Sequence, residues 1–440
     1  MENLYRRQFL VRTGLALTAT FLAPRTPSLV AQSPNPPNRS FDSWDAIRAQ
    51  FPVARDLIHM AGFFLASHPA PVAAAIERHR RGFDADPIGY WLEHEASQEA
   101  AVLRAAADYL GVEPTEIALT DSTTMGLGLL YGGVTLRLGQ DVLTTTHDHY
   151  STEMALRHRA ERTGATIRRV PLYRDLRQVS REELVENFIG ALRPSTRVAA
   201  VTWVHSSTGL KLPIREMAAA LTRVNAVRDE DERVIFCVDG VHALGVEDFR
   251  LPDVGCDFLI AGTHKWVFGP RGTGLVWGHP RAWSIANPII PTFNTEAYDI
   301  WTQDLPPHDI PKAVSMTPGG FHSFEHRWAL DEAFAFHRSI GKGRVRDRIH
   351  ALNSQLKEGL AGMPHVVLHT PRSTELSAGI VCFEVRGLTP QAVVAQLRKR
   401  GIVGSVTPYA THYARLAAGL LNDTDEVERT IRAIHELRGA

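Results

Sequence analysis

Between residues 116 and 278, short apolar runs alternate with longer amphipathic segments. The apolar runs are EIALT, DVLTTT, TIRRVPL, RVAAVTWV, RVIFCVDG, DFLIAG and TGLVWG. Several are apolar almost throughout, not at every second position only, which is typical of strands that are buried on both faces. The segments between them, such as TEMALRHRAERTG and IREMAAALTRVNAV, have helical spacing. This alternation predicts an α/β domain with a mostly parallel sheet, which we place at residues 56–310.

The C-terminal part of the chain has a different pattern. Residues 286–320 are rich in Pro, Asn and Thr and are predicted to form an irregular loop. A long helical pattern follows, with a break expected around Gly341–Gly343, where two glycines stand close together. Then come the apolar run GIVCFEV, the helical run PQAVVAQLRKRG, and a final helical run, TDEVERTIRAIHELR. This order predicts a second, smaller α+β domain at residues 311–440.

The N-terminus has the pattern of an export signal. The segment MENLYRRQFL carries paired arginines, a short apolar stretch follows that cannot span a bilayer, and small residues end at Ala31. The paired arginines resemble a twin-arginine (Tat) signal. We expect a signal peptide at residues 1–31, recognised by the Tat export machinery, a linker and N-terminal segment at 32–55, and a periplasmic or exported protein. The alternative is a disordered basic tail.

Charge and cysteine content exclude several classes of protein. Lys plus Arg and Asp plus Glu both number 48, so the formal net charge is zero. Without a basic excess we expect no nucleic-acid partner, and without a long apolar run no stable membrane insertion. The three cysteines, Cys237, Cys256 and Cys382, are scattered. They form neither a disulfide framework nor a zinc motif, and small buried apolar residues are the plain interpretation.

Polar clusters follow the predicted strands, at the edge where open α/β sheets bind ligands. In TDSTTMG, Thr123 and Thr124 begin a helix and suit a phosphate, although simple helix capping would need the same residue types. THDHYS contains His147, Asp148 and His149, which suit a ring laid over a flat ligand, a solvated loop or a metal. Because adjacent strand residues point to opposite faces, we expect no metal site.

The last two clusters carry the most chemistry. One buried run ends in Asp239, and the next ends just before Lys265, which is followed by glycines. A buried carboxylate is costly without a cationic partner, and a desolvated lysine becomes nucleophilic. A lysine that forms a Schiff base and an acid that faces a pyridinium nitrogen are what pyridoxal 5′-phosphate requires of its protein. A buried Asp–Lys ion pair is the alternative.

VDGVHALG followed by AGTHKWVFGPRGTG resembles the aminotransferase class V family of fold-type I pyridoxal-phosphate enzymes. That family includes isopenicillin N epimerase and cysteine desulfurases, and these two motifs resemble those of the epimerase-like branch. The resemblance implies a fold-type I structure, with a large cofactor-binding domain and a smaller C-terminal domain. It also implies a homodimer in which the loop Gly319–Ser323 reaches the partner's phosphate.

The resemblance also implies roles for single residues around the cofactor. Lys265 would bind it covalently and remove the substrate's α-proton, and Asp239 would keep its ring nitrogen protonated. His242 would face the ring hydroxyl, a contact that Ser206 shares. His149 would stack on the ring and is a candidate for a second acid or base.

Further residues are implied at the phosphate and the substrate. Thr123, Thr124 and His264 would bind the phosphate. Tyr150 is the alternative to the stacking histidine, and Arg415 would clamp the α-carboxylate of an amino-acid substrate with a bidentate guanidinium.

Three reactions are open for such a site: epimerisation, which the resemblance favours, then C–S or β-elimination of the desulfurase kind, then transamination. A desulfurase needs a cysteine near the clamp, and none stands between Gly401 and Asn422. A non-catalytic metabolite-binding protein is a weaker alternative. Such a protein could lose the lysine, whereas Lys265 is present in this chain. The segments Trp301–Pro311 and Gly89–Glu95 either line the side-chain pocket or are packed surface loops.

Overall fold

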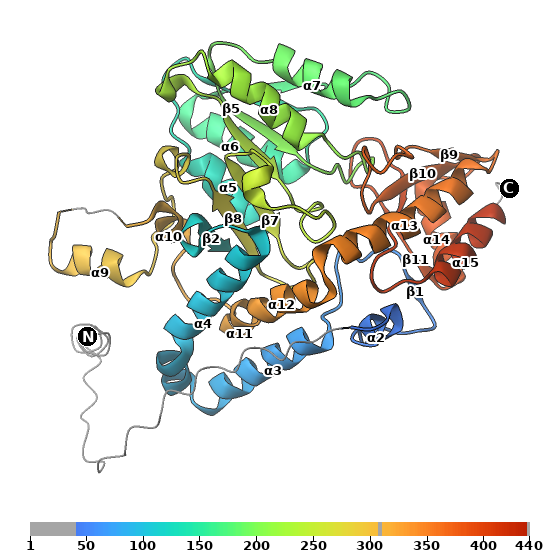
Figure 1. The fold of residues 1–440 in the computed structure, drawn as a ribbon, viewed down its shortest axis with the longest axis horizontal. Helices are drawn as coiled ribbons and strands as arrows, with labels where there is room; N and C mark the ends of the chain where they lie inside the picture. Colours follow the sequence, from blue (N-terminus) through green and yellow to red (C-terminus); the bar gives the residue numbers. More distant parts are fainter. Residues whose placement is uncertain (1–40, 307–309, 438–440) are drawn as a thin grey trace. The chain divides into compact units, whose positions relative to one another are not determined.

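A seven-stranded sheet forms the centre of the computed structural model, which describes residues 41–306 and 310–437 (Figure 1). The order of its strands is β2-β8-β7-β6-β5-β3-β4. Their bounds are β2 Ile117–Thr120, β3 Asp141–Thr145, β4 Thr166–Val170, β5 Thr196–Thr202, β6 Ile235–Asp239, β7 Phe258–Gly262 and β8 Gly274–Gly278. These strands coincide with the predicted apolar runs. The expected signal peptide, residues 1–31, lies outside the described residues.

The sheet is mostly parallel, as predicted. β4, β3, β5, β6 and β7 pair in parallel with their neighbours in that order, whereas β8 runs antiparallel to both β7 and β2. The exception follows from the short connection between Gly262 and Gly274. A parallel return needs a crossover of a dozen residues or more, usually through a helix.

Helices cover both faces of this sheet. Successive strand residues belong to different apolar clusters: Val198 packs with Leu127 of α5 on one face, and Ala199 packs with Met217 of α8 on the other. Strands buried on both faces must be apolar throughout, which explains the continuous runs. The helices are α5 Thr123–Gly133 and α6 Tyr150–Thr163 on the first face, and α7 Arg181–Gly190 and α8 Ile214–Asn225 on the second.

The segment before the sheet contains two long helices. After α2 (Trp44–Arg48) and β1 (Ile58–His59) come α3 (Ala70–Ala85) and α4 (Pro87–Leu110). Asp86 caps α4 by accepting a hydrogen bond from the Gly89 N–H at 3.0 Å, and Gly111 ends the helix in a left-handed conformation at φ 74°. The segment Gly89–Glu95 is therefore helical and not the loop that the sequence allowed.

Residues 286–320 are less irregular than predicted. They contain α9 (Thr295–Thr302) and α10 (Lys312–Met316). The Asn294 side chain accepts hydrogen bonds from the Glu296 and Ala297 N–H groups and so caps α9, which the Asn- and Pro-rich composition concealed. The predicted pocket segment Trp301–Pro311 includes residues 307–309, which lie outside the described residues.

The C-terminal part carries a second sheet, as predicted. The helical pattern divides into α11 (Phe324–Trp328), α12 (Leu330–Ile340) and α13 (Lys342–Ala361), and Gly341 at φ 95° makes the expected break. An antiparallel sheet has the order β12-β13-β10-β9, and β11 pairs in parallel with β1. The remaining elements are β9 Val366–Leu368, β10 Val381–Val385, α14 Pro390–Lys399, β11 Ile402–Val403, β12 Ser405–Val406, β13 Ala414–Leu416 and α15 Thr424–His435. A domain boundary at residues 310–311 stays a prediction.

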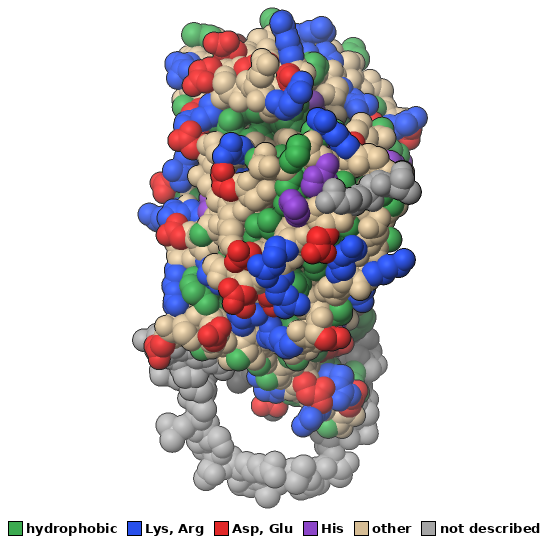
Figure 2. Space-filling model, turned by 90° about the vertical axis from the view of Figure 1, so that its right-hand side faces the viewer, with side chains coloured by type: hydrophobic (Ala, Val, Ile, Leu, Met, Phe, Trp, Pro, Cys, Tyr) green, Lys and Arg blue, Asp and Glu red, His purple; other side chains and the backbone are tan. Residues whose placement is uncertain are grey.

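Charges of both signs are distributed over the surface. On the face drawn in Figure 2, Lys and Arg side chains are interspersed with Asp and Glu, in keeping with the zero formal net charge. No helix among the described residues combines the length and the apolarity that a membrane crossing requires.

Candidate active site

The candidate site lies where the carboxyl ends of the parallel strands meet the C-terminal sheet. Asp239 is the last residue of β6, Lys265 follows β7, and Ser206 follows β5. His149 lies between β3 and α6, and Arg415 is the central residue of β13. This arrangement is the general one for open α/β sheets, in which ligands bind outside the carboxyl ends of the strands.

Asp239 is a buried carboxylate with one hydrogen bond from the chain. It is 2% exposed, and its Oδ1 accepts from the Val241 N–H at 3.1 Å. Its Oδ2 accepts no hydrogen bond from the described chain. Burial raises the pKa of Asp239 to about 6, an effect that the Val241 N–H and the nearby Lys265 partly offset. A buried acceptor of this kind fits a cationic N–H donor that the protein itself does not supply.

Lys265 is positioned by His242. The Nζ lies 3.3 Å from His242 Nε2, and the Trp266 indole N–H donates to His242 Nδ1 at 3.3 Å. An indole nitrogen can only donate, and burial lowers the pKa of His242 well below its usual range. His242 is therefore neutral with its proton on Nε2, and Lys265 can accept this proton's hydrogen bond only as an uncharged amine.

The electrostatics of Lys265 favour the uncharged amine from about pH 8 upward. Burial lowers its pKa to about 8, an effect that the charge of Asp239 opposes and that of Arg415 adds to. Asp239 and Lys265 make no ion pair within 4.0 Å, which disfavours the alternative of a buried ion pair, although the charge of each shifts the pKa of the other. The site thus separates a carboxylate from an amine whose uncharged, nucleophilic form becomes the major one above about pH 8.

The N-terminus of α5 offers unpaired donors. Ser122 caps the helix by accepting from the Met125 N–H at 3.1 Å, so the capping alternative is confirmed for that residue. Thr123 Oγ1 accepts from the Gly262 N–H at 2.7 Å, and Thr124 Oγ1 lies 3.0 Å from Ser151 Oγ. The backbone N–H groups of Thr123 and Thr124 donate to no acceptor in the described chain. A helix N-terminus with free N–H groups and hydroxyls is suited to an anion such as a phosphate.

His264 stands beside this helix end. Its Nδ1 is buried without a hydrogen-bond partner, and a Cβ on Gly262 would lie 3.0 Å from both its Cε1 and Thr123 Oγ1. His264 therefore has a ring nitrogen available where the free N–H groups converge, as its predicted role at a phosphate requires.

The THDHYS cluster serves three different purposes. His149 caps α6, its Nδ1 accepting from the Ser151 N–H at 3.2 Å, while Tyr150 is 68% exposed. The ring of His147 stacks on Tyr173 at 4.2 Å between centroids. Asp148 accepts hydrogen bonds from β3 and β5 through Thr144, Thr145 and Thr202. No three His, Cys, Asp or Glu side chains come together as metal ligands within the ranges that the structure describes.

Arg415 is a preformed clamp. It is buried, its Nε donates to Ser405 Oγ at 3.0 Å, and its Nη1 donates to the Ser206 carbonyl oxygen at 2.9 Å. The Phe63 ring packs against the guanidinium, with its centroid 4.6 Å from Cζ. These contacts leave Nη2 without a partner in the described chain. A fixed guanidinium with free N–H groups suits a carboxylate.

Sequence reasoning missed Tyr409 and Phe63. The Tyr409 hydroxyl lies 2.7 Å from Ser206 Oγ, and its ring lies edge-on to His149 with centroids 6.1 Å apart. Phe63 faces both Arg415 and His242. Neither residue follows a strand of the large sheet, so the strand-end pattern could not indicate them. The run GIVGSVTPY, with a Tyr six residues before Arg415, was the only signal.

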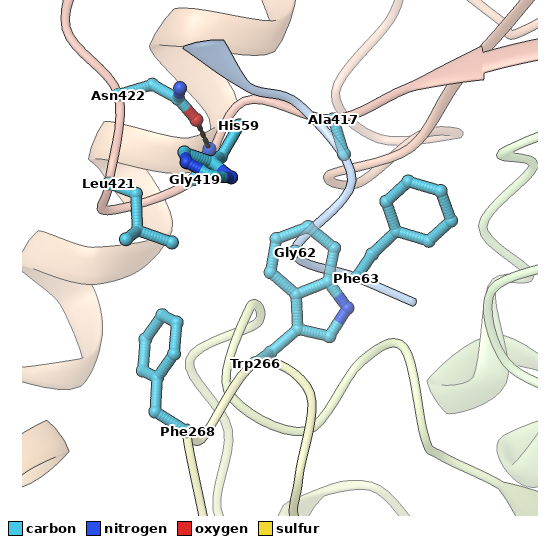
Figure 3. A pocket seen from close by; sticks show the side chains of 9 residues that line it. All are labelled: His59, Gly62, Phe63, Trp266, Phe268, Ala417, Gly419, Leu421 and Asn422. Atoms are coloured by element: carbon cyan, nitrogen blue, oxygen red, sulfur yellow. Dashed lines mark hydrogen bonds between the residues drawn. The ribbon is translucent and has the colours of Figure 1, made fainter. Parts of the chain in front are cut away.

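A small pocket adjoins the site behind Phe63 and Trp266 (Figure 3). In Figure 3 the two aromatic side chains lie next to each other, and Asn422 accepts a hydrogen bond from the Gly419 N–H at 2.9 Å. The lining residues are His59, Gly62, Phe63, Trp266, Phe268, Ala417, Gly419, Leu421 and Asn422. The pocket does not include Lys265, Asp239 or Arg415, so it supports the wall of the site and is not the site itself.

Taken together, the side chains fit pyridoxal 5′-phosphate. Free N–H groups and the His264 Nδ1 suit the phosphate, the unpaired Oδ2 of Asp239 suits a protonated ring nitrogen, and Lys265 is an amine with a lowered pKa. These groups follow the ends of three strands of one sheet, namely β2, β6 and β7. The fold and the site thus define a fold-type I pyridoxal-phosphate transferase.

The chain belongs to the aminotransferase class-V family, whose pattern matches residues 68–429. It is similar to an isopenicillin N epimerase of Streptomyces clavuligerus, with 26% identity over 375 residues, 81% of this chain and 88% of that protein. A probable cysteine desulfurase of Halobacterium salinarum is 23% identical over 90% of this chain and 96% of its own length. The predicted family and cofactor are thereby confirmed.

Solved structures share the fold. The cystine C-S lyase C-DES, in complex with its product cysteine persulfide, has a TM-score of 0.78 at 21% identity, covering 89% of this chain and 100% of that one. A cysteine desulfurase from Thermococcus onnurineus has a TM-score of 0.74 at 20% identity, covering 89% of this chain and 97% of its own. The roles assigned to single site residues stay predictions.

We expect Asp239→Asn to stabilise the cofactor-free protein. The folded-state pKa of Asp239, about 6, lies above its ordinary value of 3.8. Proton binding to Asp239 therefore stabilises the folded state fully below pH 3.8, and this stabilisation is lost as pH rises through 6. Asn does not titrate, and at pH 7.5 the free energy of unfolding should rise by about 1–3 kcal/mol. Urea unfolding at pH 7.5 and pH 4 measures this. Exposed Asp253→Asn is the control, and an equal gain at pH 4 would contradict the account.

Proposed function

We propose that the protein inverts the α-carbon of an amino acid, as an isopenicillin N epimerase-like enzyme. One observation carries the proposal: the site combines an amine of lowered pKa with a fixed carboxylate clamp, and no thiol reaches it. Such a site can bind an amino acid and move its α-proton, but it cannot accept sulfur from the substrate. Similarity to isopenicillin N epimerase supports the same reaction.

Each side chain has a separate task in this reaction. When bound, pyridoxal phosphate withdraws electrons from the substrate's α-carbon, so that its proton becomes acidic. Arg415 holds the α-carboxylate, which fixes the α-carbon relative to Lys265. Lys265 Nζ takes the α-proton as a neutral amine, the state in which His242 Nε2–H holds it. Asp239 stabilises positive charge at the buried end of the site.

All three cysteines are inaccessible, which argues against a desulfurase that carries sulfur on its own thiol. Cys237 lies in β6, Cys382 lies in β10 opposite Arg415, and Cys256 precedes β7. All are buried, and burial raises the pKa of Cys382 to about 12. A thiol that is neither exposed nor ionised cannot attack a substrate sulfur atom.

We expect a thiol reagent such as dithionitrobenzoate to label no cysteine of the native protein. All three cysteines should react once the chain is unfolded in urea. Iodoacetamide should likewise leave the activity within about twofold of the untreated enzyme, since accessible thiolate is required for reaction. Rapid labelling of one cysteine in the native protein, with loss of activity, would return the desulfurase reaction to first place.

Chiral chromatography of L-amino acids after incubation with the holoenzyme tests the proposed reaction. The panel contains the proteinogenic L-amino acids and L-cystine. Appearance of a D-enantiomer supports the proposal. Formation of a keto acid with ammonia, or of a persulfide, without any D-enantiomer would assign the enzyme to the lyases, and amino transfer to a keto acid to the transaminases.

We also propose a homodimer. Support comes from apolar side chains that are exposed in residues 289–321, next to the loop Gly319–Ser323 that the family resemblance brings to a partner's site. They are Ile289, Ile290, Phe293, Trp301 and Phe321. Light scattering of the purified protein measures the mass in solution, and a monomer at micromolar concentration would refute the dimer.

Export through the Tat route remains a proposal that rests on residues 1–31 alone. Replacement of Arg6 and Arg7 by lysines should leave the precursor in the cytoplasm, whereas the wild-type chain should appear in the periplasm. Equal distribution of both precursors would refute it.

A further inference from the structure

We propose that Tyr409 is the second proton-transferring residue of this site, and that its phenolic O–H gives a proton to the α-carbon on the face opposite Lys265. The inference rests on the proposed inversion, which requires an acid or base on each face of the α-carbon. Lys265 supplies one of these groups. For the other, the family resemblance left His149 as a candidate.

The position of Tyr409 is fixed by its loop. The loop at residues 407–413 joins β12 to β13, and Thr407 closes it at the base. The Thr407 N–H donates to the Tyr413 carbonyl oxygen at 3.0 Å, and Thr407 Oγ1 accepts from the Tyr413 N–H at 2.9 Å. Pro408 and Ala410 on either side of Tyr409 are exposed, whereas the Tyr409 side chain points inward. A clipped loop of this kind holds a side chain accurately.

Tyr409 and Arg415 hold the same residue from two sides. The Tyr409 hydroxyl contacts Ser206 Oγ at 2.7 Å, and Arg415 Nη1 contacts the Ser206 carbonyl oxygen at 2.9 Å. The Tyr409 hydroxyl and the Arg415 guanidinium therefore both contact Ser206. In a substrate whose α-carboxylate is bound by Arg415, the α-carbon is the atom bonded to that carboxylate. Lys265 approaches from β7 of the large sheet, whereas Tyr409 approaches from the C-terminal sheet. The two groups thus reach the clamp from different elements.

The charge state of Tyr409 suits a proton donor. Burial raises the pKa of Tyr409 to about 12, an effect that the Ser206 hydrogen bond and the charge of Arg415 partly offset. The phenol therefore carries its proton at neutral pH, and the phenolate that it leaves stands near a guanidinium. Burial lowers the pKa of His149, whose ring lies edge-on to Tyr409, and so disfavours the imidazolium form that would donate the proton.

The proton transfers balance. The substrate's Cα–H bond breaks, its proton goes to Lys265 Nζ, and the electron pair stays on the substrate. The O–H bond of Tyr409 then breaks, and its proton forms a new Cα–H bond on the other face. The phenolate regains a proton from solvent, and the Lys265 ammonium releases one, so no oxidant or reductant is consumed.

The test separates exchange of the α-proton from inversion. Wild-type, Tyr409→Phe and Tyr413→Phe holoenzymes are incubated in heavy water with the L-amino acid of the same panel that the wild-type enzyme exchanges fastest. Proton NMR follows loss of the α-proton, and chiral chromatography follows the D-enantiomer. Tyr413→Phe removes a hydroxyl of the same loop that forms no hydrogen bond among the described residues. The ring of Tyr413 stacks on His369. Cofactor affinity of the apoproteins, from tryptophan fluorescence, is the readout that does not depend on activity.

In Tyr409→Phe we expect inversion to fall at least about 100-fold, since a positioned acid or base contributes about 10²–10⁴-fold. Exchange with retention of the L-form should stay within about threefold of the wild-type rate, as should cofactor affinity, and Tyr413→Phe should match the wild type. Inversion near the wild-type rate, equal losses of exchange and inversion, or a tenfold loss of cofactor affinity in Tyr409→Phe would each overturn the role of Tyr409. A wild-type enzyme that exchanges the α-proton without inversion would overturn the proposed function instead, and with it this inference.

Discussion

Lys265→Ala is expected to lower the rate of α-proton exchange by about 10³-fold or more, because the variant loses both the nucleophile and the base. Lys265 acts as the base in its uncharged form, which accepts the His242 Nε2–H and becomes the major form above about pH 8. No other lysine makes a hydrogen bond to the site residues described above, so none can replace it without a rearrangement of the chain.

Two measurements check this prediction. Proton NMR in heavy water gives the exchange rate, and borohydride reduction followed by peptide mass spectrometry shows whether the cofactor is covalently attached. Lys399→Ala, at the exposed end of α14, is the matched control and should keep both properties. Exchange in Lys265→Ala within tenfold of the wild-type rate would show that another group removes the α-proton.

Arg415→Lys is expected to raise the KM for an amino acid by about 10–100-fold, with a smaller effect on kcat. Lysine provides a point charge in place of a planar fork and loses the bidentate contact to a carboxylate. The change also leaves the Ser206 carbonyl and the Ser405 hydroxyl without their present donor, so some loss of stability accompanies it.

A comparison of two ligands separates the clamp from the loss of stability. Spectrophotometric binding of an amino acid should weaken in the variant, whereas binding of the corresponding amine, which lacks the α-carboxylate, should be nearly unchanged. Arg400→Lys, at an exposed position after α14, is the control. Equal weakening of the two ligands would remove Arg415 from carboxylate recognition.

The large sheet could be predicted well because its physics is local. A strand that is buried on both faces must be apolar throughout. The adjacent apolar residues Val198 and Ala199 therefore indicate β5, and they belong to the apolar clusters on its two opposite faces. The direction of β8 could also have been derived, since the short connection from Gly262 leaves no room for a crossover. The helix α9 was hidden because Asn294, which adds to a composition that suggests a loop, also caps the helix, and α10 has only five residues, preceded by Pro311.

The site was predictable only where it follows strand ends. Asp239 and Lys265 stand there, and their polar chemistry contrasts with the apolar runs before them. The wall formed by Phe63 and the hydroxyl of Tyr409 depend on how the C-terminal sheet and the segment after β1 meet the large sheet. Nothing local in the sequence specifies that meeting. The hydrogen bond that His242 offers to Lys265 likewise depends on one from Trp266 to His242 that no spacing rule contains.

One measurement tests the central claim most directly, namely that Lys265 and Arg415 form a site that inverts an amino acid. It is proton NMR of the wild-type holoenzyme in heavy water with the L-amino acid panel, followed by chiral analysis of the same samples. The account predicts that at least one amino acid loses its α-proton signal, keeps its side-chain signals and appears as the D-enantiomer. Loss of the side-chain signals with release of ammonia, or no exchange with any amino acid of the panel, would contradict it.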